Sequence, residues 1–191
     1  MPVSWVFSAL PCMLKSQRIK HLRKQNQILH AVHQDPVAAN EMSNQVDHTF
    51  VVVQTLHELL RVQQFLRDNK LPADDLSLSN TTMVIMREDE SVVASGAVEW
   101  LGDTALLRSV AVANSLRGSG LGKKIVFELL QRAKQNKVQS IYLLTETAPD
   151  FLEKLGFVTV SREATPEVIR KTTEFAHVCP ASARVMRITL P

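Results

Sequence analysis

The segment from Leu116 to Lys123, which reads LRGSGLGK, constrains this chain more than any other part of it. The preceding stretch, residues 105–112, is apolar and β-branched and predicts a buried strand. Apolar residues at helical spacing follow the segment as far as about Asn136. A strand, a glycine-rich turn and a helix start form an anion-binding device, because glycines allow close approach and the first helical N–H groups lack intrahelical partners. Arg117 and Lys123 add positive charge, so the segment suits a diphosphate.

The spacing of this segment excludes two common nucleotide-binding fingerprints. A Walker loop requires Gly-Lys followed by Ser or Thr, whereas Lys124 follows Lys123 here. A Rossmann turn requires G-x-G-x-x-G, whereas the three glycines here form G-x-G-x-G. The segment instead resembles the Arg-x-x-Gly-x-Gly acetyl-coenzyme A loop of the GNAT N-acetyltransferases, with Arg117, Gly120 and Gly122 at the defining positions.

A second motif follows in the order that this family shows. Residues 140–145 predict an apolar strand, and residues 148–157 then read APDFLEKLGF. The latter resembles the family's short helix that ends in Lys-x-Gly-Phe. Phe151 and Leu155 share one face of this helix, and Gly156 supplies its C-cap. On these two separated motifs the chain is identified as a member of the GNAT superfamily.

The resemblance covers about residues 48–191, which we take as the N-acetyltransferase domain. It implies an α/β fold with a mixed, mostly antiparallel sheet of six or seven strands, splayed between the fourth and fifth strands and flanked by helices. The residue patterns themselves predict strands over 49–53, 81–86, 91–100, 105–112, 140–145 and 183–190, with a further strand opening at 157.

Capping residues and periodicity predict two further helices. Thr55 is expected to cap an amphipathic helix that ends before Leu71. Its inward face is expected to hold Leu56, Leu59, Leu60, Val62 and Phe65. Thr165 is expected to cap a later helix with Pro166 at its first position. That helix is expected to carry Val168, Ile169, Thr172 and Phe175.

Composition sets the broad class of the chain. Its 191 residues allow one domain with a sizeable core, and no apolar run approaches the ~18 residues that span a membrane. The only cysteines are Cys12 and Cys179, so we expect no disulfide framework and a cytoplasmic location. Residues 1–41 hold the excess of basic over acidic residues, so the charge of the remainder does not indicate a nucleic-acid partner.

Residues 1–41 do not share the organisation of the domain. Three interpretations compete: an organelle-targeting presequence, an appended helix over about residues 13–32, and a stretch that is not translated because Met42 is the start. We favour the third, because organisation begins abruptly after Met42.

The family resemblance implies how acetyl-coenzyme A is bound as the co-substrate. The main chain of Val110, Ala111 and Val112 is expected to bind the pantetheine arm as an added strand, with one N–H polarising the thioester carbonyl. The diphosphate is expected to lie on the backbone of the loop, whose binding residues are Arg117, Gly118, Ser119, Gly120, Leu121, Gly122 and Lys123. No metal site is expected.

The sequence also offers candidates for the acid and the base. Leu152 stands where many family members have a tyrosine that protonates the thiolate, and Tyr142 is expected in the core. Glu99 is our candidate for the base, since burial on its strand would raise its pKa, although an outward-facing strand residue is the alternative. Arg108 and Ser109 point to opposite faces of their strand, and one is expected to face the acceptor pocket. Arg108 would receive an acidic acceptor or pair with Glu99.

The expected activity is acetyl transfer to the amine of a small molecule, by a chain that is a monomer or homodimer. Two alternatives stay open: acetylation of a protein or peptide terminus, and a coenzyme-A-binding regulatory module with weak catalysis, suggested by Leu152. Residues 107–109, Phe175 and the Cys-Pro-x-Ser-Ala stretch at Cys179 resemble the GNAT subfamily linked to arsenic resistance. A single cysteine is a poor arsenite site, so we expect Cys179 to be structural.

Overall fold

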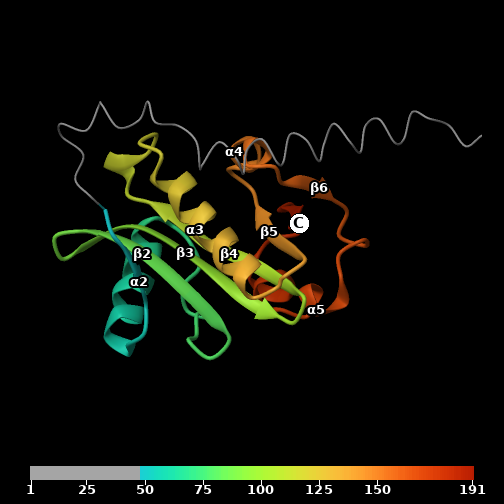
Figure 1. Ribbon diagram of the computed structural model, residues 1–191, viewed down its shortest axis with the longest axis horizontal. Coiled ribbons are helices and arrows are strands. Elements are labelled where there is room, and N and C mark those ends of the chain that lie inside the picture. Colours follow the sequence, from blue (N-terminus) through green and yellow to red (C-terminus); the bar gives the residue numbers. More distant parts are fainter. Residues whose placement is uncertain (1–47) are drawn as a thin grey trace, which may run out of the picture. The chain divides into compact units, whose positions relative to one another are not determined.

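The structure is a computed structural model that describes residues 48–191, so the predictions for residues 1–41 lie outside the described residues. Seven strands form one sheet in the described part (Figure 1). They are β1 (Phe50–Val52), β2 (Thr81–Glu88), β3 (Ser91–Leu101), β4 (Thr104–Val112), β5 (Ser140–Thr145), β6 (Val158–Val160) and β7 (Arg184–Thr189). The helical segments are α2 (Leu56–Asp68), η2 (Asn114–Leu116), α3 (Leu121–Gln135), α4 (Pro149–Lys154), α5 (Glu167–Arg170) and η3 (Glu174–Val178), of which η2 is a 3-10 turn and η3 a π-helical turn.

The sheet is mixed, with the strand order β1-β2-β3-β4-β5-β7-β6. The pair between β4 and β5 is parallel and all the others are antiparallel. The parallel ladder contains only Thr104–Leu106 of β4 against Ser140–Tyr142 of β5. The rest of β5 stays paired with β7 instead. The two central strands therefore diverge toward their carboxyl ends, which confirms the predicted splay.

A bulge interrupts β4 just beyond the point of divergence. Ser95 of β3 lies opposite Ala111 and Ala97 lies opposite Arg108, so Gly96 alone faces two residues of β4. One of these, Ser109, has a φ of +55°, in the left-handed region that residues other than glycine rarely occupy. Two residues of one strand opposite a single residue of its neighbour form a β-bulge.

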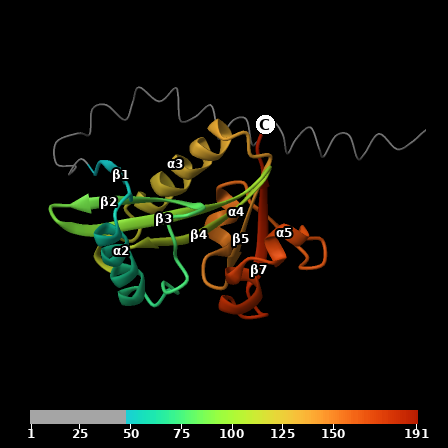
Figure 2. The ribbon, with the colours of Figure 1, turned by 90° about the horizontal axis from the view of Figure 1, so that it is seen from below.

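Helices cover both faces of the sheet (Figure 2). α3 buries Ile125, Val126 and Leu129 against the core formed with β3, β4 and β5. α2 packs on the opposite face, in a second core with residues of β2 and β3. The two helices therefore hold the first half of the sheet from opposite sides.

The face of α2 differs from the prediction at two positions. Thr55 caps the helix as expected: the Glu58 N–H donates to its hydroxyl at 3.2 Å, and the Glu58 carboxylate accepts from the Thr55 N–H at 3.3 Å. However, Leu56 and Leu60 are 67% and 54% exposed. Leu59 and Val62 are buried as expected, and Leu66 is buried as well. The apolar stripe is wider than the surface that the sheet offers, so one edge of it stays in solvent.

The predicted helix after Thr165 is shorter, and its cap is different. Thr165 is buried and its hydroxyl donates to the Ser161 carbonyl at 3.0 Å, so Pro166 takes the cap position without a side-chain hydrogen bond. α5 ends at Arg170, and the Thr172 hydroxyl then donates to the Ile169 carbonyl at 2.7 Å. Such local side-chain bonds compete with helical pairing. Thr172 and Phe175 therefore lie beyond α5.

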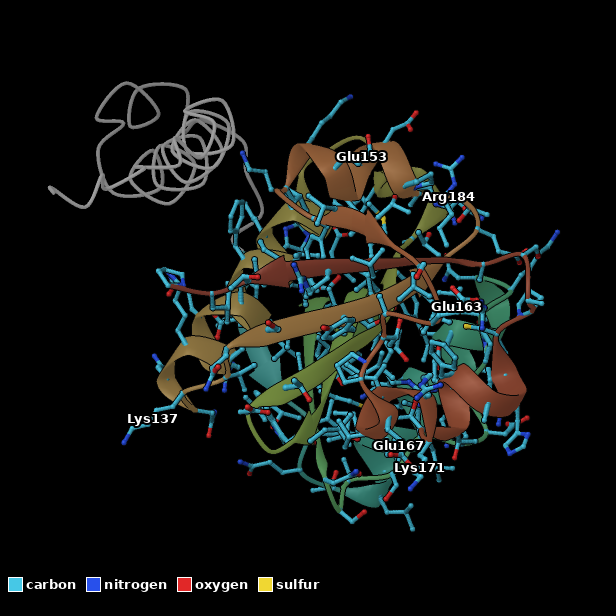
Figure 3. All side chains as sticks on the ribbon, turned by 90° about the vertical axis from the view of Figure 1, so that its right-hand side faces the viewer. Lys137, Glu153, Glu163, Glu167, Lys171 and Arg184 are labelled. Atoms are coloured by element: carbon cyan, nitrogen blue, oxygen red, sulfur yellow. The ribbon has the colours of Figure 1, made fainter. Side chains whose placement is uncertain are left out.

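The outer side of α5 carries an exposed ion pair. Glu167 and Lys171, one turn apart, lie side by side with 2.7 Å between Oε1 and Nζ (Figure 3). Exposed pairs of this kind contribute about 0.3–0.5 kcal/mol. α5 is thus held by its buried Ile169 rather than by its surface charges.

Candidate active site

The loop before α3 has the backbone form that the glycine pattern predicts. Gly118 and Gly120 have φ values of +84° and +88°, and Gly120 is the N-cap of α3. A Cβ atom at either glycine would meet no atom within 4 Å, so glycine is needed for the backbone conformation and the space beside it is open. No side chain caps α3, so the N–H groups of its first turn face outward.

Positive charge surrounds this helix start. The Arg117 Nε donates to the Val112 carbonyl at 3.3 Å, and its NH2 group donates to Asn69 Oδ1 at 3.4 Å. These bonds join the loop to the end of β4 and to the end of α2. The Lys123 Nζ lies 5.5 Å from the centre of the Phe127 ring. The helix dipole and both cations favour an anion at this point.

The carboxyl half of β4 runs next to this loop. Val110, Ala111 and Val112 lie beyond Leu106, where the ladder with β5 ends. A Cβ placed at Gly122 would lie 3.5 Å from Val112 Cγ2 and 3.6 Å from Phe151 Cζ, so the start of α3 approaches both β4 and α4 closely. The predicted binding loop and the predicted binding strand therefore meet in one place.

Glu99 lies on β3, on the face of the sheet opposite α3, and its side chain is half-buried. Its Oε1 accepts a hydrogen bond from Asn80 Nδ2 at 3.1 Å. On the neighbouring strands Thr81 and Leu106 lie opposite it. The amide of Asn80 fixes the orientation of this carboxylate.

Arg108 is 7% exposed and is held by two carboxylates. It forms a two-point pair with Asp75, with 2.8 Å between NH2 and Oδ1 and 2.7 Å between NH1 and Oδ2. Its NH2 also lies 2.7 Å from Glu174 Oε2. Arg108 does not form a direct ion pair with Glu99, which was one of the two partners that the sequence suggested for it. The guanidinium instead joins the α2–β2 segment to η3 across β4.

Burial sets the protonation of the neighbouring groups. It raises the pKa of Glu174 above 4.5, although the attraction of Arg108 acts in the opposite direction. The Cys179 thiol donates to Glu174 Oε1 at 3.3 Å. Burial and the nearby carboxylate raise the pKa of Cys179 to about 12, so the thiol is protonated at neutral pH.

Asp75 and Glu174 were not identified from the sequence. Asp75 is in a connecting segment and Glu174 is in a short helical turn, and no local pattern links either residue to Arg108. The available signal was indirect: an arginine on a strand that is otherwise apolar requires carboxylate partners if it is buried. Leu152 and Tyr142 are buried in the core, which confirms the expectation for Tyr142.

Residues 48–191 contain no group of three or more His, Cys, Asp or Glu side chains placed to hold a metal ion. Within the same residues no helix has the length and apolar character needed to cross a membrane.

Comparison with known proteins agrees with this geometry. A crystal structure of a GNAT-family acetyltransferase from Staphylococcus aureus Mu50 is similar with a TM-score of 0.61, at 16% identity, over 75% of this chain and 100% of that one. N-acetylglutamate synthase from Neisseria gonorrhoeae, solved with coenzyme A and N-acetyl-glutamate, is similar with a TM-score of 0.59, at 14% identity, over 76% of this chain and 36% of that one. The splayed mixed sheet with its flanking helices is thus the GNAT fold, the fold of a class of acyltransferases.

Sequence comparison gives the family of the central segment. Residues 79–159 match the family model for the acetyltransferase (GNAT) domain. This match covers less than half of the chain. The citrate (pro-3S)-lyase ligase of Escherichia coli K12 is 28% identical over 107 residues, a match that spans 54% of this chain and only 28% of that ligase.

Proposed function

We propose that this chain transfers an acetyl group from acetyl-coenzyme A to the amino group of a small molecule. The observation that carries the proposal is the meeting of two binding elements: the uncapped start of α3 and the half of β4 that has no partner strand on its β5 side. The first suits phosphates, and the second suits an extended arm that adds to the sheet. Coenzyme A carries both, and the related synthase was solved with it.

Each part of the cofactor has a proposed set of partners. The diphosphate binds the backbone N–H groups from Gly118 to Lys123, with Arg117 and Lys123 supplying charge. The pantetheine arm lies along Val110–Val112. One main-chain N–H of this stretch polarises the thioester carbonyl, where negative charge develops during attack.

The transfer requires a neutral amine. Its nitrogen forms a bond to the thioester carbon, the carbon–sulfur bond breaks, and the amine proton passes to a base. We assign that base to Glu99, whose carboxylate is oriented by Asn80 at 3.1 Å. Leu152 is in the core and supplies no proton to the leaving group. The thiolate leaves unprotonated, because a thiol pKa of ~8.5 makes it a stable leaving group near neutral pH.

The ion pairs of Arg108 support a small acceptor rather than a long peptide. They tie the α2–β2 segment to η3 across β4, at the point where β4 leaves β5. A peptide would need a passage between these segments. We also propose that one of the two residues Arg108 and Ser109 faces the acceptor pocket. An acidic acceptor would then have to displace one of the two carboxylates already bound to Arg108.

Titration calorimetry with acetyl-coenzyme A tests the cofactor site. We expect saturable binding by the natural chain and no binding by Gly120→Glu, because the substitution puts a bulky anion where the diphosphate would lie. A non-glycine residue at a φ of +88° costs about 1–2 kcal/mol, so the variant should stay folded. Unchanged affinity in a folded Gly120→Glu variant contradicts the proposed site.

Thioester turnover with a panel of amines then tests the activity. Turnover of small amines is the expected result. Turnover with peptide termini alone would favour a protein acetyltransferase, and binding without turnover would favour a regulatory module that binds coenzyme A. Each of these results replaces our proposal by a stated alternative.

Several finer assignments stay proposals. We place the chain in the arsenic-resistance subfamily on the basis of residues 107–109, Phe175 and the stretch at Cys179 alone. We also propose a cytoplasmic location and a monomer or homodimer. Metabolite profiling by mass spectrometry, with and without the protein, would identify the acceptor and test the subfamily assignment.

A further inference from the structure

Gly96 is the point where α3 lies closest to the sheet. A Cβ atom at this position would lie 2.5 Å from Ile125 Cγ2 and 2.8 Å from Leu129 Cδ1, both closer than real Cβ contacts allow. At Gly102, Gly118, Gly120 and Gly122 a Cβ would meet no such obstacle. The height of α3 above β3 therefore depends on the absence of a side chain at residue 96.

The same glycine faces the bulge of β4. Gly96 lies opposite Ser109 and Val110, and Val110 Cγ2 is 3.7 Å from the Cβ position of residue 96. α3 and the bulge of β4 therefore both lie against Gly96, on different sides of it. Ile125 lies about one turn beyond the start of α3, so this contact is close to the proposed diphosphate site.

The residue before Gly96 holds the bulge in its unusual conformation. Ser95 is 1% exposed, and its hydroxyl donates to the Ser109 carbonyl at 3.0 Å. Ser109 has a φ of +55°, and such a residue persists only when its surroundings fix it. Ser95 thus directs the peptide unit that leads into Val110.

We propose that Gly96 and Ser95 are positioning residues that set the distance between the phosphate-binding end of α3 and the acyl-binding bulge of β4. The inference rests on the proposed function, because a single coenzyme A molecule would span both sites. A helix is rigid over one turn, so a shift of α3 at Ile125 moves its N-terminus with it. A Cβ at residue 96 requires a shift of about 1 Å, and a misplacement of this size can reduce a rate ~10²-fold.

The experiment compares two ligands on the full chain and on Gly96→Ala. One is acetyl-coenzyme A, which spans both sites. The other is 3′-phosphoadenosine 5′-diphosphate, which lacks the pantetheine arm and needs only the end of α3. We expect the variant to bind the fragment as the natural chain does, to bind acetyl-coenzyme A at least ~10-fold more weakly, and to have kcat/KM about 10²-fold lower.

Two further variants separate positioning from a general loss of stability. Gly102→Ala is the matched control: its φ of +77° makes it strained, but its Cβ would meet no atom within 4 Å, so both affinities should be unchanged. Ile125→Leu removes the nearer of the two methyl groups that obstruct residue 96 and keeps the volume, so adding it to Gly96→Ala should restore part of the lost affinity.

If Gly96→Ala does not fold, Ser95→Ala serves in its place, with the expected result that kcat falls several-fold while fragment binding is unchanged. The proposal is overturned if both ligands lose affinity by the same factor, or if neither Gly96→Ala nor Ser95→Ala differs from Gly102→Ala. A natural chain that binds neither ligand would instead refute the proposed function.

Discussion

The pairing of Arg108 predicts a large loss of stability for Arg108→Met. The guanidinium has a side-chain exposure of 5%, and its partners Asp75 and Glu174 have side-chain exposures of 16% and 11%. Removing one member of a buried ion pair leaves an uncompensated charge and costs about 3–5 kcal/mol. For a domain of this size that loss corresponds to a fall in Tm of roughly 10–15 °C.

The size of the loss should depend on pH in a defined direction. Burial already raises the pKa of Glu174, and removing Arg108 removes the main opposing attraction, so the pKa rises further in the variant. At acidic pH Glu174 is protonated in the variant, and one of the two orphaned charges is gone. The difference between Arg108→Met and the natural chain should therefore be smaller at pH 5 than at pH 8.

Urea unfolding followed by circular dichroism at both pH values measures these effects. Arg61→Met is the matched control, because Arg61 pairs with Glu90 at 3.1 Å on the surface, with side-chain exposures of 32% and 85%. That pair should be worth about 0–1 kcal/mol at either pH. If Arg108→Met loses no more stability than Arg61→Met, the buried network does not contribute as we reason.

Three further predictions follow from other parts of the structure. The pKa of Glu174 is raised in the folded state, so its contribution to stability is fully present below pH 4.5 and is lost as the pH rises through the folded pKa. The natural chain should therefore lose stability relative to Glu174→Gln as the pH increases. Parallel urea-midpoint profiles of the two chains over pH 4–8 would contradict this. Glu99→Gln should lower kcat roughly 10²-fold with cofactor affinity nearly intact, and high pH should partly restore kcat, whereas Leu152→Tyr should change kcat little. A normal kcat of Glu99→Gln across pH 6–9 excludes Glu99 as the base. Leu59→Ala should cost about 2–5 kcal/mol and Leu60→Ala at most ~0.5 kcal/mol in chemical denaturation, and equal losses would show that the exposed edge of α2 is covered.

Features that depend on neighbours in the sequence were predicted well. The cap of α2 needs only Thr55 and Glu58, which lie within one turn of each other. The left-handed positions at Gly118, Gly120 and Gly156 are set by single residues, because only glycine adopts them at little cost. Strand ranges were close to the observed ones, since alternation and apolar runs report burial directly.

Features that depend on packing or on competing hydrogen bonds were predicted poorly. Leu56 and Leu60 look as apolar as Leu59, but the sheet covers only part of the stripe. Thr165 has the residue type of a cap, but a carbonyl four residues earlier takes its hydroxyl. The extent of the sheet surface decides the first case and a competing hydrogen bond decides the second, and residue type alone reveals neither.

The sequence by itself determined the class of fold, the order of the elements and the glycine loop before α3, because these follow from short-range periodicity and from backbone freedom at single residues. Only the tertiary structure decided the surroundings of the site: the bulge at Ser109, the contact of Gly96 with α3, and the partners of Arg108. These depend on atoms that are distant in the chain, and on strand register in particular. A shift of one residue in the pairing of β3 with β4 moves each side chain to the other face, and no local pattern fixes that shift.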